Sequence, residues 1–313
     1  MNETRPEVWP ALPFAEWKET AATLHMWTQI VGKVRLALTP WINHSWHVTL
    51  YVTARGLTTS PIVHDSRCFE IEFDFVGHKL FIRCSDGAQR EIPLRPMAVA
   101  EFYERLMSAL RNLGLEVKIS TAPNEVEDAT PFPQDQKHAS YDPEYANRFW
   151  RVLLQTDRAF KEFRSRFIGK CSPVHFFWGS FDLAVTRFSG RMAPTHPGGV
   201  PHLPNAVAQE AYSHEVSSCG FWPGNEAMPE PIFYSYAYSA PEGFAEAKVQ
   251  PLAAHWNTTL REYVLPYDAV RTANAPNETL MSFLQSTYEA AATLAKWDRH
   301  ALEHKGAWPY GAR

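Results

Sequence analysis

The sequence has no basic run, no long apolar segment and little net charge. Lysine and arginine number 30 against 34 acidic residues, a net charge of -4. Because proteins that bind nucleic acid backbones carry clustered cationic residues, we expect no nucleic acid partner. No window approaches the roughly 20 apolar residues that span a bilayer. The first residues, MNETRPEVWP, lack the basic start and apolar stretch of a secretion signal. We therefore expect a soluble, cytoplasmic protein with no membrane partner.

The sequence also lacks the compact motifs of several large enzyme classes. It contains no GxGxxG, GxxxxGK[ST], GxSxG or HExxH pattern, so the mechanisms attached to those motifs have no support. Its four cysteines form no CxxC pair, which argues against zinc ribbons and redox dithiols and favours reduced thiols. A catalytic triad assembled from distant residues stays open.

The most unusual absence is that of lysine between Cys171 and Ala240. Surfaces that face water rarely lack lysine for so long, so this stretch is expected to be buried. Four of the 13 histidines lie in it, at positions 175, 196, 202 and 214, among many aromatic residues. Aromatic side chains suit the wall of a deep pocket. We expect the main functional surface here, with Trp178, Trp222 and Tyr236 as ligand-binding residues.

Hydrophobic periodicity predicts helices and strands in the first half of the chain. Apolar residues from Trp17 to Val31 recur every three or four positions, which indicates a helix. Strands are predicted over residues 47–54, 69–75 and 79–84, the last two forming a hairpin. A second helix runs from Pro96 to Gly114, and alternation predicts a strand over 115–119.

Residues 121–141 are rich in proline and polar residues, which predicts a linker or long loop. A long helix then begins at Asp142 and Pro143 and ends near Gly169. Strand-like runs follow at 174–187, 214–222, 232–239 and 261–265, before a last helix capped by Asn277. We therefore predict an α+β fold of mainly antiparallel sheets with flanking helices. Its halves, residues 1–120 and 142–313, are similar enough in element order to suggest duplication, and the second carries the main candidate site.

The segment HFFWGSFD contains an aspartate in an apolar run. Strand alternation places Trp178, Ser180 and Asp182 on one face and His175, Phe177 and Phe181 on the other, unless Gly179 introduces a bulge. A buried carboxylate needs a partner or a function. Asp182 is therefore either paired with Arg187 or Arg191 or catalytic, and His175 is a second catalytic candidate.

The segment AYSHEVSSCGFWPG supplies two further catalytic candidates, His214 and Glu215. Alternation points them to opposite faces of a strand, so only one of them is expected to face a site. His214 suits an acid, a base or a metal ligand, and equally a structural histidine. The loop 196–204 either carries His202 over a pocket as a lid or is a plain connector.

Two smaller clusters complete the candidate ligand-binding residues. PWINHSWHV gathers Asn43, His44 and Trp46 just before a strand, either as a site or as an edge of the core. LPYDAVR offers Tyr267 and Arg271, where the arginine either clamps an anionic ligand or forms a surface ion pair.

Four strings resemble a bacterial family of uncharacterised proteins, domain of unknown function 5996. In chain order they are NHSWHVTLYVTARGLTTS, HFFWGSFDLAVTRFSGR, AYSHEVSSCGFWPG and FYSYAY. The resemblance implies that the chain is one family unit. It also implies family motif positions for Asn43, His44, Trp46, His175, Asp182, His214, Glu215 and Trp222. It implies no activity.

The aromatic, histidine-bearing stretch and the cluster around His44 and Trp46 favour a protein that binds a small polar organic ligand between its halves. We expect it to be an enzyme with His, Asp and Glu acid–base groups. A non-catalytic binding or scaffolding protein with an aromatic interaction surface is the first alternative. The second is a metal-dependent enzyme with histidine and carboxylate ligands, although the histidine spacing matches no compact signature. Metal, cofactor and oligomeric state stay unknown.

Overall fold

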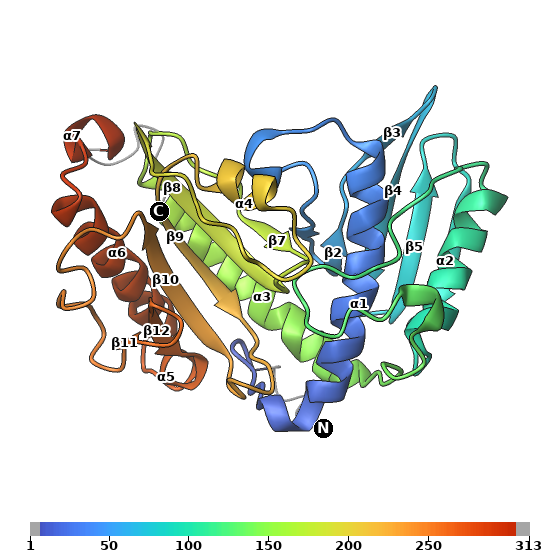
Figure 1. The fold of residues 1–313 in the computed structure, drawn as a ribbon. Coiled ribbons are helices and arrows are strands. Elements are labelled where there is room, and N and C mark those ends of the chain that lie inside the picture. The colour runs from blue at the N-terminus through green and yellow to red at the C-terminus, as the bar shows by residue number, and fades with distance from the viewer. Residues whose placement is uncertain (1–6, 305–313) are drawn as a thin grey trace.

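The computed structural model describes residues 7–304 and confirms an α+β fold with two antiparallel six-stranded sheets (Figure 1). The helices of the described chain are α1 (Phe14–Leu38), α2 (Val99–Asn112), α3 (Pro143–Ser165), α4 (Asn205–Ala211), α5 (Tyr267–Arg271), α6 (Pro276–Leu294) and α7 (Arg299–Leu302). Short 3-10 turns lie at Asn43–Ser45 and Phe132–Gln134.

The first sheet contains strands from the first half of the chain. They are β1 (Tyr51–Val52), β2 (Gly56–Thr58), β3 (Ile62–His64), β4 (Arg67–Asp74), β5 (Lys79–Cys84) and β6 (Gln89–Pro93). The order is β1-β2-β4-β5-β6, and β3 pairs with β4. The predicted hairpin is confirmed as β4 and β5, because alternate apolar residues such as Ile71 and Phe73 bury one face of the pair.

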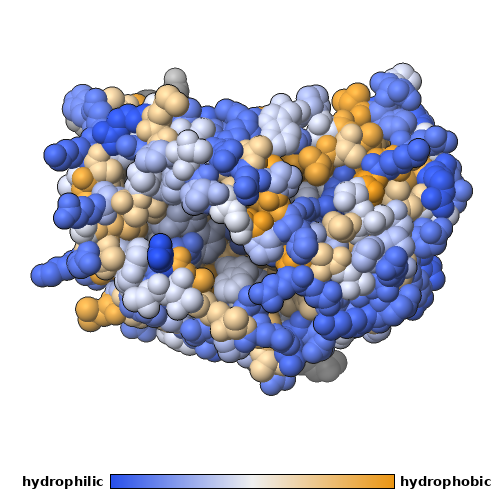
Figure 2. Space-filling model, in the orientation of Figure 1, coloured by the Kyte–Doolittle hydropathy of each residue, from blue (hydrophilic) through white to orange (hydrophobic). Residues whose placement is uncertain are grey.

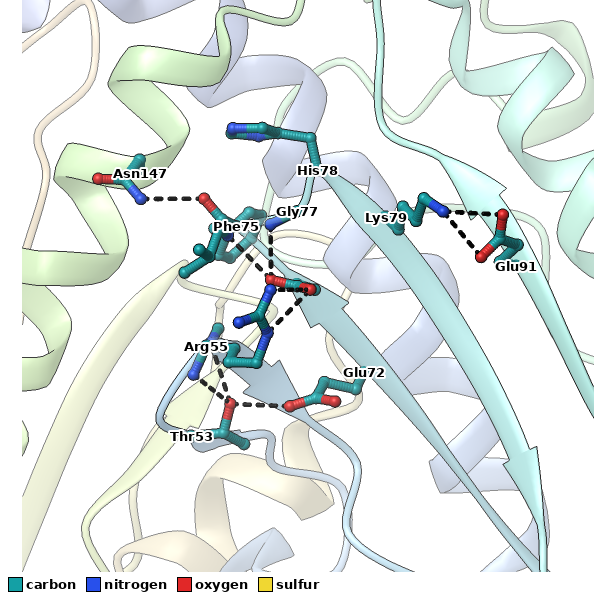
Figure 3. Close-up of polar contacts among 12 residues, drawn as sticks. Thr53, Arg55, Glu72, Phe75, Gly77, His78, Lys79, Glu91 and Asn147 are labelled. Carbon is teal, nitrogen blue, oxygen red and sulfur yellow. Dashed lines mark hydrogen bonds and ion pairs between the residues drawn. The ribbon is translucent and has the colours of Figure 1, made fainter. Parts of the chain in front are cut away.

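The turn that joins β4 and β5 is held by a buried aspartate, Asp74. Its carboxylate accepts hydrogen bonds from the backbone N–H groups of Val76 and Gly77, both at 2.9 Å. Arg55 donates to the same carboxylate at 2.7 Å, as Figure 3 shows. From α3, the Asn147 side chain donates to the Phe75 carbonyl at 3.0 Å (Figure 3). The Asn147 contact attaches the first sheet to α3.

The second sheet contains strands from the second half and positions the candidate site. They are β7 (His175–Phe177), β8 (Asp182–Met192), β9 (His214–Trp222), β10 (Ile232–Tyr238), β11 (His255–Asn257) and β12 (Glu262–Pro266). Their order is β11-β12-β10-β9-β8-β7. Helix α3 packs against β8, and α6 packs against β9 and β10, so one face of this sheet is covered by helices (Figure 1).

The two sheets meet at Leu50 and Phe176. These residues exchange two backbone hydrogen bonds, at 2.9 and 2.8 Å, in an antiparallel bridge. The Trp150 indole of α3 also donates to the Thr53 carbonyl at 3.0 Å. Buried apolar side chains from both halves form one continuous cluster. A division into separate domains therefore stays a prediction. The different strand orders give no support to duplication.

Several sequence-based boundaries were wrong. The run 174–187 is a hairpin rather than one strand, because the chain turns between Phe177 and Asp182 and Phe181 has a φ of 60°. Residues 115–119 pair with no strand of the described chain. The segment 47–54 contributes only the two residues of β1. Asn277 lies inside the first turn of α6, which begins at Pro276.

Two further expectations concern the whole chain. All four cysteines are free thiols, as expected. Within residues 7–304, no helix combines the length and apolar character needed to cross a bilayer.

Candidate functional site

A pocket of about 690 Å³ opens on the second sheet, on the face away from α3 and α6. Its floor consists of residues from β8, β9, β10 and β12. Helix α4 and the loop before it supply one wall, and the end of α1 with residues 41–48 supplies another. Residues 120–125 complete the lining. Figure 2 shows the hollow near the centre of the molecule, and Figure 1 places α4 beside it. Both halves of the chain thus build the pocket.

The walls are mainly apolar and the polar groups gather on part of the floor. Val200, Leu203 and Pro204 of the loop, with Val207 and Ala208 of α4, face the space. The loop 196–204 therefore lies along the pocket rather than apart from it. The lining also contains many aromatic rings: Trp41, Trp46, Phe177, Trp178, Phe188, Tyr212, Trp222, Tyr234 and Tyr236.

Asp182 is the most buried acid of the pocket, with 6% of its surface exposed. It is the first residue of β8, directly after the hairpin turn. The Tyr234 hydroxyl donates a hydrogen bond to its Oδ2. Its Oδ1 is buried and has no hydrogen-bond partner among residues 7–304. Burial raises the pKa of this carboxyl to about 7, and the nearby Glu125 charge adds to the rise. Asp182 can therefore gain or lose a proton near neutral pH.

A glycine allows Tyr234 to reach Asp182. Tyr234 on β10 is paired with Gly220 on β9, which lies between β10 and β8. A Cβ atom at position 220 would lie 2.3 Å from the Tyr234 ring and hydroxyl. Because glycine has no side chain, the tyrosine crosses β9 in close contact with its backbone. The polar floor thus depends on a glycine from a third strand.

Two more carboxyls face the same space. Glu262 begins β12, beyond Tyr236, and burial raises its pKa to about 8 with a contribution from the Asp182 charge. Glu125 accepts a hydrogen bond from the Ser180 hydroxyl at 2.5 Å, and burial raises its pKa as well. Within the part of the chain that the structure describes, none of these three acids forms an ion pair. The pocket therefore concentrates acidic groups without a compensating cation.

Lys33 of α1 is the cationic group of the described lining. It is 3% exposed, and its ammonium donates to the Asn124 side-chain oxygen and lies 5.6 Å from the Trp178 ring centre. Burial lowers its pKa to about 8. The hydrogen-bond partner of the Lys33 ammonium is an amide oxygen and not a carboxylate.

Other tyrosines continue the polar floor. The hydroxyls of Tyr212 and Tyr236 are 3.0 Å apart, and the rings of Tyr234 and Tyr236 stack at 6.1 Å. Burial raises the pKa of Tyr212 to about 12, and burial also places that of Tyr236 well above its usual value. Both hydroxyls therefore stay protonated and serve as hydrogen-bonding groups.

The structure brings together six of the residues that the sequence predicted for the site. Asp182, His44, Trp46, Trp178, Trp222 and Tyr236 all line the pocket. His44 accepts a hydrogen bond at 2.6 Å from Lys170, and its pKa is lowered by burial and by that lysine. The imidazole at this end of the pocket is therefore neutral at ordinary pH.

His175 lies outside the lining, although the hairpin puts it on the same face as Asp182. In the register, Phe177 pairs with Asp182 and His175 with Ala184, so all four share one face. The predicted opposition of His175 and Asp182 was wrong because the chain reverses at the turn. His175 packs against Phe177 and Trp46, with ring centres 4.5 and 6.5 Å away. Burial lowers its pKa to about 3, so it is uncharged.

The remaining predicted residues also lie outside the lining. Glu215 pairs with Arg191 at 2.6 Å, and the His214 ring contacts the Ser213 hydroxyl at 3.0 Å. Asn43 is exposed. The His202 carbonyl, rather than its ring, contacts the Asn124 side chain.

Tyr267 and Arg271 belong to the core and the surface rather than to the pocket. Tyr267 is buried, and its hydroxyl donates to the Pro10 carbonyl at 2.7 Å. Arg271 pairs with Asp268 at 2.5 Å, which is the surface ion pair considered from the sequence.

The alternative that Asp182 pairs with Arg187 or Arg191 was wrong. Arg187 is an odd-numbered residue of β8 and points to the opposite face, where its guanidinium lies 3.5 Å from the Phe163 ring centre. Arg191 binds Glu215 instead. Neither arginine therefore neutralises the buried carboxylate, whose one side-chain partner in residues 7–304 is the Tyr234 hydroxyl.

Sequence reasoning missed Glu125, Glu262 and Lys33 as site residues, whereas Tyr234 was among the aromatic residues expected to wall a pocket in the lysine-free stretch. Glu125 lies in the polar segment that was predicted to be a linker, and Lys33 lies inside a helix with an apolar pattern. Tyr234 alternates with the predicted Tyr236 in FYSYAY. Glu262 comes near Tyr234 and Tyr236 only through the strand order of the second sheet, in which β12 pairs with β10.

Residues 7–304 contain no set of side chains arranged as metal ligands. No group of three or more His, Cys, Asp or Glu side chains in this range is arranged to hold a metal ion. The proximity of the three pocket acids therefore does not amount to a coordination site.

The chain belongs to the Family of unknown function (DUF5996), which matches residues 9–304. The resemblance seen in the sequence is thereby confirmed over nearly the whole chain. Comparisons with curated proteins and with solved structures gave no match.

Proposed function

We propose that this member of the DUF5996 family binds a small organic molecule in the pocket on the second sheet, with Asp182 as its polar anchor. The observation that carries the proposal is that Asp182 lines the pocket and that its Oδ1 atom is buried with no partner in residues 7–304. A buried polar atom without a hydrogen bond costs free energy, which a bound ligand with a suitable donor would recover.

The size and lining of the pocket support the same function. A volume of about 690 Å³ lies within the range of sites for drug-sized ligands, about 300–1,000 Å³. Apolar walls with a few polar groups on one side favour a ligand with an apolar body and a polar end. The scaffolding alternative has less support, because Trp41 is the one exposed aromatic side chain of the described chain.

A fragment screen observed through the tryptophan indole N–H signals tests this proposal. We expect saturable shifts at Trp178 and Trp222 with some fragments. An Ala211→Trp variant should abolish them by filling the pocket, since Ala211 lines it. Ala301→Trp on exposed α7 is the matched control and should leave binding unchanged. Fragments that bind the Ala211→Trp variant equally well would contradict the proposal.

A second function, acid–base catalysis on the bound molecule, is favoured by the pKa of Asp182 near 7. A carboxyl that titrates near neutrality transfers protons efficiently at physiological pH. Fragments that bind should be incubated with the protein and analysed for conversion by mass spectrometry. We expect Asp182→Asn to abolish conversion at saturating ligand. Conversion at the wild-type rate in that variant would exclude Asp182 as the proton-transfer group.

A further inference from the structure

We propose that the ligand of this pocket carries a cationic nitrogen group, an ammonium or amidinium, that binds between Asp182 and Glu262 over the tyrosine rings of β10. This inference rests on the proposed ligand-binding function and specifies the chemical class of the ligand.

Among residues 7–304, the acids of the pocket have no compensating cation. Asp182, Glu262 and Glu125 face one space, and no Lys, Arg or His of the described chain forms an ion pair with them. The nearby Lys33 ammonium donates to Asn124 instead. Several carboxyls gathered in a low-dielectric pocket repel one another when ionised. A cation placed among them removes this repulsion and supplies the donor that Asp182 Oδ1 needs.

An aromatic surface lies between Asp182 and Glu262. Asp182 is on β8 and Glu262 on β12, and Tyr234 and Tyr236 project from β10, between those strands. Their rings stack at 6.1 Å with an interplanar angle of 16°. Aromatic faces attract cations, and rings combined with carboxylates are a common way to hold organic ammonium groups. The floor therefore offers charge and π surface at the same place.

The described pocket lining offers few hydrogen-bond donors to an anionic ligand. Lys33 is the cation of the described lining, and burial lowers its pKa to about 8. His44 is neutral because burial and Lys170 lower its pKa. An anionic head group would therefore meet three acids and one weakened cation, which disfavours it.

The apolar walls indicate the rest of the ligand. Leu203, Val207 and Ala208 face the floor from α4 and its preceding loop. A primary or substituted amine with an aliphatic or aromatic body would bury both of its ends.

Three probes of similar size test the charge requirement: benzylamine, benzyl alcohol and benzoate. Binding is measured by the indole N–H shifts of Trp178 and Trp222 at a pH just above 8, where Asp182 is largely ionised and Glu262 is about half ionised. We expect saturable binding of benzylamine and much weaker binding of the other two. Benzyl alcohol or benzoate binding as tightly as benzylamine would overturn the cation proposal and leave the ligand-binding function standing. Absence of saturable benzylamine binding would overturn the cation proposal as well. The ligand-binding function itself falls only if the wider fragment screen finds no ligand that Ala211→Trp excludes.

Variants identify the acids involved. Asp182→Asn and Glu262→Gln keep the side-chain shape and should each weaken benzylamine binding about tenfold or more, since each removes a charge-assisted contact. Glu91→Gln is the control, because Glu91 pairs with Lys79 on the surface of the other sheet. Unfolding by urea shows whether each variant is folded. Folded Asp182→Asn and Glu262→Gln variants with wild-type affinity would refute the assignment.

The pH dependence of the affinity is measured with a permanent cation, benzyltrimethylammonium. Its charge is fixed, so its affinity should rise as the pH increases through about 7 and about 8, where Asp182 and Glu262 ionise. Glu125, Lys33, His44 and three tyrosines also face the pocket. Deprotonation of Lys33 near pH 8 acts in the same direction. The Asp182→Asn/Glu262→Gln double variant separates these contributions and should lose most of the rise. A wild-type affinity that is flat with pH would contradict the proposal.

Discussion

Each sheet buries an aspartate beside a hairpin turn, and the two carboxylates differ in their hydrogen-bond partners. Asp74 ends β4 and is 3% exposed, and Asp182 begins β8 and is 6% exposed. Asp74 accepts bonds from Arg55 and from two backbone N–H groups of its own turn. Asp182 accepts one from Tyr234, and its other oxygen has no partner in residues 7–304.

This difference separates a structural acid from a candidate functional one. Although burial opposes ionisation of Asp74, its hydrogen bonds hold its pKa below the usual value. Burial raises the pKa of Asp182 to about 7 with much less compensation. Similar burial thus gives opposite electrostatics, and what differs is whether the surrounding structure satisfies the carboxylate or leaves it facing a pocket.

The largest expected effect is an opposite pH dependence of stability. The pKa of Asp182 is raised on folding, so its contribution to stability is full below the unfolded value of 3.8 and is lost as the pH rises to about 7. The loss is at most about 4 kcal/mol. Asp74 has a lowered pKa, so its contribution is full above 3.8 and is lost as the pH falls.

Urea unfolding at a series of pH values checks this contrast. Asp182→Asn should remove much of the decline in stability between about pH 4 and pH 7. Asp74→Asn should instead flatten the acid limb. Identical pH profiles for the two variants would remove the basis of the comparison.

The second effect concerns stability at neutral pH. Asp74→Asn should lower the free energy of unfolding by about 2–3 kcal/mol, because Arg55 and a turn N–H lose a charged acceptor. Asp182→Asn should leave it unchanged or raise it, since an amide avoids the cost of a buried charge. Urea denaturation measures both. A larger loss from Asp182→Asn than from Asp74→Asn would mean that Asp182 is the structural residue.

The third effect tests the glycine that lets Tyr234 approach. Gly220→Ala should destabilise the protein by about 1–2 kcal/mol, because the new methyl group displaces the tyrosine ring. It should also weaken benzylamine binding. In a Tyr234→Ala background the same substitution should cost little. A double-mutant cycle by urea unfolding gives the coupling, and a coupling near zero would contradict the proposed contact.

The smallest effect concerns the tyrosine hydroxyl. Tyr234→Phe removes the hydrogen bond that favours ionised Asp182, so the Asp182 pKa should rise above its wild-type value of about 7. The stability at pH 8 should fall by about 1 kcal/mol. Carboxyl carbon NMR titration reports the pKa directly. An unchanged pKa would show that Tyr234 does not compensate the charge.

The main helices and the first hairpin could be predicted from the sequence because they depend on local pattern. The helical period around Trp17 and Trp27 predicted α1, and alternation from Phe69 to Phe75 predicted β4. The failures occurred where a turn interrupts an apolar run. In HFFWGSFD, alternation put His175 and Asp182 on opposite faces, but the hairpin reversal puts them on the same face.

Part of the candidate site was also accessible from the sequence. Missing lysines and abundant aromatic residues marked the stretch that supplies much of the pocket, and the buried acid of that stretch is Asp182. Glu125 and Lys33 gave no comparable signal. Each lies in a segment whose local pattern indicates something else, a loop or a helix, and becomes part of the pocket only through packing.

The sequence by itself determined the α+β class, the main helices, the β4–β5 hairpin and the stretch that supplies much of the pocket. The expected burial of that stretch holds for most of its strand residues but is wrong for residues 190–206, none of which is buried. Periodicity and composition are local properties, and they follow directly from which side chains leave water. Only the tertiary structure decided that Asp182, Glu262 and Glu125 share one space, and that His175 lies on the same face as Asp182. Strand order and hairpin register set these positions, and both depend on contacts between residues far apart in the chain.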